Sequence, residues 1–195
     1  SLYAYRVYGD GTITRVVLCS CLPVDLAGGF SAWEITFDGV GPIRLGMTVD
    51  EVRAVLPDAT DFLPQNDTDA ATWRPAASAP WLSVEVADGT VSKVTVQPLN
   101  GYDDDLSQGP ALPHIRGIRV GDTMQTVYNY LPGGTTYDVL AAGLHSYLIA
   151  TRTGPVVSFR ESWDGNSVVA AITLADSNRA DINFPAPDAL DLSAF

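Results

Sequence analysis

The sequence predicts an α+β protein built from two tandem units, each a short helix packed on an antiparallel sheet, with an N-terminal β-hairpin. Two repeats carry this prediction. The segment Ile43–Thr48 returns as Ile118–Thr123, at an offset of 75 residues. A turn followed by an apolar strand occurs three times, with Ile13, Val91 and Val169 spaced 78 residues apart. A repeat of this length indicates that one supersecondary unit was used more than once.

The N-terminal hairpin, residues 1–22, has no helix motif of its own. Its turn is Asp10-Gly11, a pair that favours tight hairpins. The segment is either a cap on the sheet of the first unit or the remnant of an upstream unit. We favour the cap, because an uncovered sheet edge invites pairing with other chains.

The first unit is predicted over residues 23–100, beginning with a strand over 32–37. Its helix starts at Thr48, which forms a capping box with Glu51. The apolar face of the helix is predicted from spacings of three and four residues. The residues of that face, and the proline that ends the helix, are Val52, Val55, Leu56 and Pro57.

Strands complete the first unit. Residues 61–80 lack a clear period and predict a loop with one short strand near Thr72 and Trp73. Residues 81–87 and the strand from Val91 to Val96 predict a hairpin, because Asp88-Gly89 between them is a typical hairpin turn.

A linker is predicted over residues 101–113, where proline, glycine and aspartate are frequent. The second unit follows over 114–176. Thr123 caps its helix, and Val127, Tyr130 and Leu131 are expected to form the buried face. Strands are expected over 146–151, 156–162 and 168–174. Residues 177–195 form a tail that is rich in proline and aspartate.

The charge balance excludes several classes of partner. The chain has 11 Lys and Arg against 23 Asp and Glu, for a net charge of −12. Such a surface repels phosphate backbones and anionic lipids, so nucleic acid is not expected as a partner. No apolar run is long enough to cross a bilayer, so no membrane insertion is expected. The charge instead favours a partner with a basic surface, or a cation.

The sequence contains no convincing catalytic set. There is no nucleophile elbow, and neither His114 nor His145 has a neighbour in the sequence that would orient it. Cys19 and Cys21 are too close for an unstrained disulfide if they lie on one strand, and further metal ligands at workable spacing are missing. We therefore expect no enzyme activity, no metal and no cofactor.

Aromatic and acidic residues are the remaining candidates for function. Tryptophan and tyrosine on a sheet give a large contact area at a low cost in conformational entropy. Tyr128 matches Arg53 in the repeat, and is therefore expected off the buried helix face. The candidate binding residues are Trp73, Trp81, Tyr128, Tyr137, Tyr147, Trp163, Asp103, Asp104 and Asp105.

The helix start resembles a known family. The motif Ile43-Arg44-Leu45-Gly46-Met47-Thr48 with Val52 returns from Ile118 to Val127, with Asp122 in place of the methionine. Over residues 40–175 this pattern resembles the β-lactamase inhibitor protein family, and it is similar to that of small bacterial outer-membrane assembly lipoproteins. The resemblance implies secreted bacterial proteins whose tandem units form a concave protein-binding sheet. The inhibitor family has a disulfide in each unit, and neither unit here contains cysteine.

These observations predict an acidic, extracytoplasmic, non-enzymatic module that binds another protein, in the manner of an inhibitor. Two alternatives stay open. The chain could be a small-ligand or hydrolytic protein that uses His145 with a carboxylate in the groove between the units. It could also be a purely structural envelope module.

Overall fold

The computed structural model describes residues 2–7, 13–19, 30–55, 63–65, 68–73, 81–98, 106–139, 144–150, 154–162 and 165–179. In chain order the strands, α-helices and 3₁₀ helices (η) are β1 (Leu2–Val7), β2 (Ile13–Cys19), η1 (Phe30–Ala32), β3 (Gly39–Val40), β4 (Ile43–Arg44), α1 (Val49–Val55), β5 (Leu63–Gln65), β6 (Thr68–Trp73), β7 (Trp81–Ala87), β8 (Thr90–Gln97), η2 (Leu106–Ala111), α2 (Met124–Tyr130), β9 (Thr135–Val139), β10 (Leu144–Ala150), β11 (Pro155–Glu161) and β12 (Val169–Asp176).

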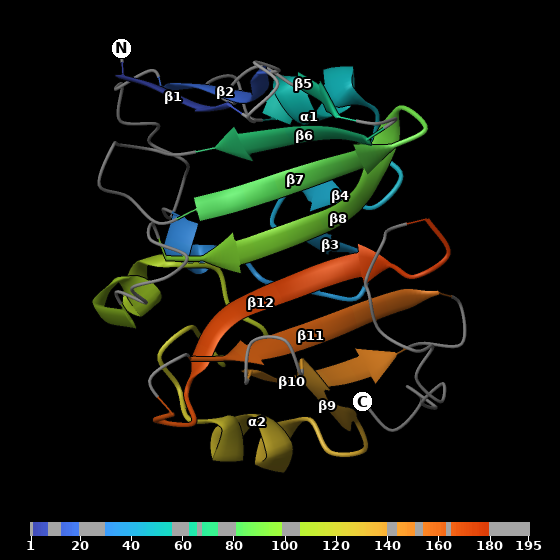
Figure 1. Ribbon diagram of the computed structural model, residues 1–195. Coiled ribbons are helices and arrows are strands. Elements are labelled where there is room, and N and C mark those ends of the chain that lie inside the picture. Colours follow the sequence, from blue (N-terminus) through green and yellow to red (C-terminus); the bar gives the residue numbers. More distant parts are fainter. Residues whose placement is uncertain are drawn as a thin grey trace.

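One eight-stranded antiparallel sheet dominates the fold, in the order β5-β6-β7-β8-β12-β11-β10-β9 (Figure 1). Strands β1 and β2 form a separate hairpin, and β3 pairs with β4. The predicted α+β class and the N-terminal hairpin are confirmed at this level. The sheet is continuous through both predicted units, because β8 and β12 pair at its centre.

Equivalent backbone hydrogen bonds occur in both halves of the sheet, with the helix-side residues 75 apart and the strand residues 78 apart. The N–H of Gly46 donates to the carbonyl of Val91 at 2.8 Å, and the N–H of Gly121 donates to that of Val169 at 2.8 Å. The bridge between Thr48 and Thr90 has its counterpart between Thr123 and Val168. Each helix start is thus joined to a sheet strand in the same way.

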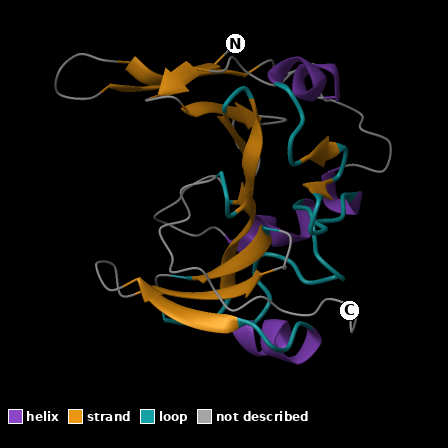
Figure 2. Ribbon diagram, turned by 90° about the vertical axis from the view of Figure 1, so that its right-hand side faces the viewer, coloured by secondary structure: helices purple, strands orange, loops and turns teal. Residues whose placement is uncertain are grey.

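The main core lies on one face of the sheet. Strand residues alternate between faces, and the register puts Val94 opposite Leu174 and Val96 opposite Ile172. These four side chains are buried in a cluster that also contains Val52 of α1 and residues of α2. Both α-helices lie on the same side of the sheet, towards its two ends (Figure 2).

The helices begin as the sequence predicts. The N–H of Thr48 donates to Oε2 of Glu51 at 2.8 Å, and the N–H of Glu51 donates to Oγ1 of Thr48 at 3.3 Å, which is a capping box. Thr123 has an extended backbone and accepts from the N–H of Thr126 at 3.2 Å.

The buried face of α2 differs from the expected one. Met124, Val127 and Leu131 are buried, whereas Tyr130 is 63% exposed. At about 100° per residue, Met124 and Leu131 lie about 60° and about 40° to one side of Val127, whereas Tyr130 lies about 60° to the other side. In α1, Val52 is buried and Val55 is half-buried. Leu56 and Pro57 lie outside the described residues.

Three segments form elements that differ from the prediction. Residues 32–37 make only isolated bridges, since Ile35 pairs with Val40 and Glu34 with His114, so the expected strand is wrong. Within residues 61–80, β5 and β6 form a hairpin where one short strand was expected. Strand β9 was not predicted at all.

The C-terminal part of the predicted linker belongs to the folded core. Residues 106–111 form η2, and Leu112 after them is fully buried. The N–H of Ile35 donates to the carbonyl of His114 at 2.6 Å, and the N–H of His114 donates to that of Trp33 at 3.1 Å. These bonds tie the start of the second predicted unit to the first. The proposed domain boundaries stay a prediction.

The N-terminal hairpin lies at the β5 end of the large sheet, where β2 contacts β5 and β6. This position agrees with what a cap requires. Whether the hairpin is a cap or the remnant of another unit stays a prediction, as does the state of Cys21, which lies outside the described residues.

The capping box of α1 gives a stability prediction. Thr48→Ala removes the acceptor for the N–H of Glu51 and should lower the free energy of unfolding by about 1 kcal/mol. Thr48→Ser keeps a hydroxyl and serves as the control. Urea unfolding measures both variants, and an unchanged midpoint for Thr48→Ala would contradict the capping role.

Candidate protein-binding surface

The second face of the sheet, opposite the core, carries a row of hydroxyl side chains across four adjacent strands. Ser83 lies opposite Thr95, Thr95 opposite Thr173, and Thr173 opposite Ser158. We call these four residues the hydroxyl row. All four are half-buried. At its centre, Oγ1 of Thr95 and Oγ1 of Thr173 are 3.2 Å apart and share a hydrogen bond.

Charged groups flank the hydroxyl row. Nζ of Lys93 is 2.7 Å from Oε2 of Glu85, and these side chains are 21% and 32% exposed. The position matching Glu85 in the other half of the sheet is Arg160, at an offset of 75 residues. A register shift follows each of the two residues. Equivalent places on the two halves thus carry opposite charges, which makes this face unsymmetrical.

Apolar side chains also lie on the second face, beyond the hydroxyl row. Leu148 is opposite Ser158, and Val156 is opposite Ala175. These three apolar residues are buried, yet they are outside the main core cluster. The half-exposed polar groups therefore concentrate on β7 and β8 and at the central pair.

Two of the predicted aromatic residues meet on the core side, at the α2 end of the sheet. The rings of Tyr128 and Tyr147 are edge-to-face, with centroids 5.0 Å apart. Tyr147 is only 5% exposed. Its hydroxyl donates to the carbonyl of Leu131 at 2.7 Å and accepts from the N–H of Gly134 at 2.7 Å. Tyr147 therefore serves the core and the end of α2, and does not offer its ring to a partner.

Tyr128 is half-buried and packs against the core, so it is not fully off the buried helix face as expected. Burial raises the pKa of its hydroxyl, and the negative charge of Glu161 raises that pKa further. A hydrogen bond with Thr136 lowers this pKa and so partly offsets the other two effects. Tyr128 thus joins α2 to β9.

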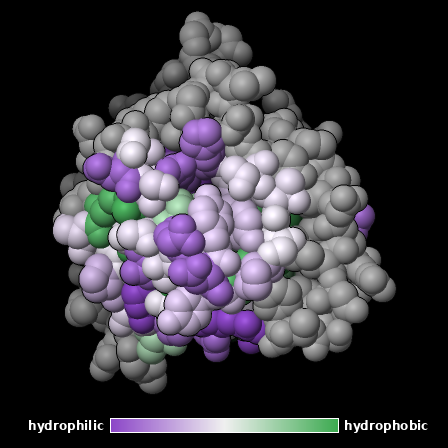
Figure 3. Space-filling model, turned by 90° about the horizontal axis from the view of Figure 1, so that it is seen from below, coloured by the Kyte–Doolittle hydropathy of each residue, from purple (hydrophilic) through white to green (hydrophobic). Residues whose placement is uncertain are grey.

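Exposed groups on α2 are mostly polar. The end of the molecule that carries α2 is largely hydrophilic or neutral among its described residues, with apolar colour confined to small areas (Figure 3). Nε2 of Gln125 donates to Oδ1 of Asn129 at 3.0 Å on this surface. Tyr130 is the large exposed apolar side chain of the described residues. The candidate list from the sequence omitted it.

The remaining candidates are described in part or not at all. For Trp73, Trp81 and Tyr137 the structure gives only backbone pairing: they lie opposite Leu82, Gln97 and Ser146. Trp163, Asp103, Asp104 and Asp105 lie outside the described residues. The roles predicted for these seven residues stay predictions.

The two histidines occupy different settings. His145 is exposed on β10 and lies opposite Asp138 in the register with β9. His114 is half-buried, and its Nδ1 accepts from the N–H of Gly117 at 3.2 Å. In the described ranges, no three His, Cys, Asp or Glu residues gather as metal ligands would. The helices of the described chain are all too short or too polar to span a bilayer.

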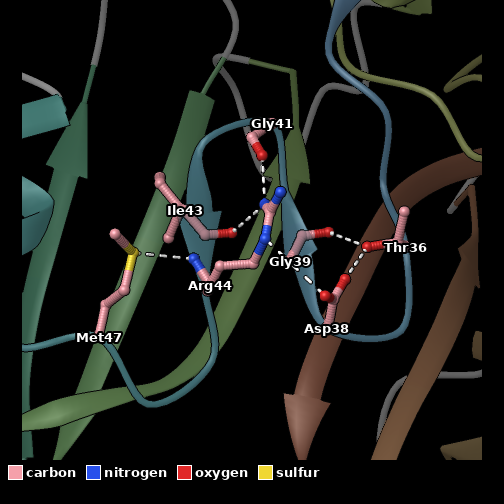
Figure 4. Close-up of polar contacts among 7 residues, drawn as sticks. All are labelled: Thr36, Asp38, Gly39, Gly41, Ile43, Arg44 and Met47. Carbon is pink, nitrogen blue, oxygen red and sulfur yellow. Dashed lines mark hydrogen bonds and ion pairs between the residues drawn. The ribbon is translucent and has the colours of Figure 1, made fainter.

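Arg44 organises the turn that leads into α1 (Figure 4). Its guanidinium donates to the carbonyls of Gly41 and Ile43 and lies 3.8 Å from a carboxylate oxygen of Asp38. The N–H of Arg44 donates to Sδ of Met47 at 3.0 Å. Gly41 has a φ of +55°, and a side chain there would collide with the indole of Trp33.

Arg119, the counterpart of Arg44, makes a different contact. Its guanidinium donates to the carbonyl of Leu112 and, at 2.9 Å, to that of Ser31. The N–H of Arg119 donates to Oδ2 of Asp122 at 2.7 Å, so a carboxylate replaces the sulfur of Met47. Arg119 thereby holds the first predicted unit against the second.

Sequence reasoning missed the hydroxyl row. The signal was present in the alternation of Ser83 with Leu82 and Val84, and of Thr95 with Val94 and Val96. Alternation shows which residues share a face within one strand. It does not show which strands are neighbours, and the row depends on the pairing of β8 with β12.

Comparison with known proteins gives only distant structural similarity. No protein-family model matches the chain, and no curated protein matches it. A cysteine-rich secretory protein of Staphylococcus aureus is 7% identical, with a TM-score of 0.42 over 69% of this chain and 44% of its own. An extracellular protein with an SCP domain from Bacillus anthracis is 10% identical, with a TM-score of 0.48 over 73% of this chain and 47% of its own.

A DUF4309 family protein of Bacillus subtilis is 14% identical, with a TM-score of 0.43 over 66% of this chain and 78% of its own. The chain spans less than half the length of the first two of these proteins. At these TM-scores the similarities assign no function.

The hydroxyl of Tyr147 gives a second stability prediction. Tyr147→Phe leaves the carbonyl of Leu131 and the N–H of Gly134 without this partner in a buried place, which should cost about 1–3 kcal/mol. Thermal unfolding measures the loss. Tyr130→Phe, on the exposed side of α2, is the matched control and should change stability little.

Tyr128 gives a pH prediction. Its folded-state pKa is raised, so the folded state holds this proton more tightly than the unfolded state does. The resulting stabilisation is present below the unfolded pKa of about 10 and is lost as the pH rises through the folded pKa. Tyr128→Phe should flatten the fall in the unfolding midpoint above about pH 10. An equally steep fall in the variant would contradict this.

Proposed function

We propose that this chain is a non-enzymatic binding module that recognises another protein through the second face of its sheet. The observation that carries the proposal is that the α-helices cover only one face of the sheet. Both α-helices pack on the core face, whereas the hydroxyl row and the Glu85–Lys93 pair lie half-exposed on the other. Hydroxyl groups and a partly exposed ion pair are suited to polar, hydrogen-bonded recognition.

The proposal includes two tandem units. Equivalent hydrogen bonds in the two halves and the pairing of Thr95 with Thr173 support this organisation. Two related half-surfaces then meet at the hydroxyl row, and a partner can span both. The opposite charges of Glu85 and Arg160 would fix the orientation of that partner, because charge complementarity sets specificity more than raw affinity.

The proposed setting is extracytoplasmic, and the proposed action is inhibitor-like. Both rest on the resemblance of the Ile43–Val52 motif to secreted bacterial binding proteins. The net charge of −12 supports a partner whose contact surface is basic.

Site-specific photo-crosslinking tests the proposal. A photoreactive amino acid at position 83 lies in the hydroxyl row, and one at position 125 lies on the exposed side of α2. In bacterial envelope extract, we expect a discrete adduct from position 83 and none from position 125.

A competition arm decides whether the hydroxyl row makes the contact. Unlabelled wild-type protein should abolish the adduct, whereas Thr95→Arg should compete at least about 10-fold more weakly, equal to about 1.4 kcal/mol of binding. Equal competition by Thr95→Arg, or adducts from position 125 alone, would overturn the proposed surface.

A further inference from the structure

We propose that the outer edge of β9 binds an extended basic peptide as an added strand of the sheet. The inference deepens the proposed function, since the ligand is part of a protein partner. It uses the backbone edge of the sheet, separate from the hydroxyl row. Strand addition of this kind obtains affinity from main-chain hydrogen bonds and specificity from side chains.

Strand β9 is the longer of the two strands that end the large sheet. It contains five residues, Thr135–Val139, and all five pair with β10 in a continuous register. The opposite end is β5, which contains three residues. Within the described ranges, β9 pairs with β10 alone. Among the described residues, nothing pairs with its other edge, which carries a run of backbone donors and acceptors.

The two edge strands of the sheet differ in how they are protected against pairing with another strand. Strand β5 includes Pro64, which has no N–H to donate, and the β1–β2 hairpin lies beside it. Proteins commonly protect a sheet edge with proline, with a covering segment, with lysine or with a bulge. Strand β9 has no lysine, proline or glycine, and its pairing with β10 shows no bulge. Thr135 and Thr136 are exposed there.

The negative charge of the chain determines which kind of strand the edge of β9 would bind. A second copy of this chain would bring its own net charge of −12, which opposes self-pairing. The sequence of β9 includes one acidic residue, Asp138, and no lysine or arginine. The charge of Glu161, at the end of β11, also reaches the hydroxyl of Tyr128 on α2. The net negative charge of the chain, together with the sequence of β9, favours a strand that carries arginine or lysine.

Two synthetic peptides test the inference on the full chain. Each alternates threonine and valine, and one ends in arginine while the other ends in glutamate. Fluorescence anisotropy should show binding of the arginine peptide and at least about 10-fold weaker binding of the glutamate peptide. Hydrogen exchange should slow at the amides of β9 when the arginine peptide is bound.

Proline substitutions identify the edge. Consecutive N–H groups of a strand point to opposite sides, so only one of Thr135→Pro and Thr136→Pro removes a donor from the outer edge. The other weakens pairing with β10 and lowers the melting temperature. The variant that keeps its melting temperature should lose the arginine peptide, whereas Thr135→Ala and Thr136→Ala should retain it.

Several results would overturn the inference. These are equal affinity for both peptides, protection of amides outside β9, or unchanged binding in the thermally stable proline variant. A dimer held by β9 in sedimentation would assign the edge to a second copy instead. Thr95→Arg should leave peptide binding unchanged. If the arginine peptide does not bind but crosslinking from position 83 persists, the edge site is excluded and the proposed function is retained.

Discussion

The pairing of β8 with β12 is the constraint on which the architecture depends. It is the single junction through which the two halves of the large sheet become one. The register centres on Thr95 and Thr173, which are 78 residues apart, the same offset that separates the repeated hairpins. The pair Val96–Ile172 on one side of this centre is equivalent by the repeat to the pair Leu174–Val94 on the other side. The sheet is therefore approximately twofold symmetric. One continuous core follows, because Val94 and Leu174 bury the same face.

Within this symmetry the halves have kept their backbone geometry and changed their side chains. The turn before each helix is closed by an acceptor three residues after the arginine, a sulfur in Met47 and a carboxylate in Asp122. The side chains of the two arginines differ more in their contacts. Arg44 closes its own loop, whereas Arg119 reaches back to Ser31 and joins the halves. Geometry that is shared by both copies belongs to the fold, and the proposed recognition of an unsymmetrical partner would depend on the differences.

The sequence predicts the parts of the fold that depend on local chemistry. The capping box of Thr48 and the hairpin turn at Asp88 are encoded within a few residues, and both occur in the structure. Strand β9 was missed because its residues, Thr-Thr-Tyr-Asp-Val, show no apolar alternation. The expected strand over 32–37 failed because Ile35 bonds to His114, a distant partner that no local pattern reveals. The hydroxyl row depends in the same way on long-range pairing, whereas the burial of Tyr147 depends on the position of α2.

The symmetry of the central junction also bears on how molecules could exchange parts. Strand β8 meets β12 with Val94 opposite Leu174 and Val96 opposite Ile172. The β8 strand of another molecule would present almost the same apolar order, centred on the same threonine. When the halves of one molecule separate, each exposes an edge that fits a neighbour as well as it fits its own partner. Domain swapping is a low-cost route to dimers in such a case. High concentration and partial unfolding would therefore favour closed, exchanged dimers, which dilution and refolding should convert back to monomers.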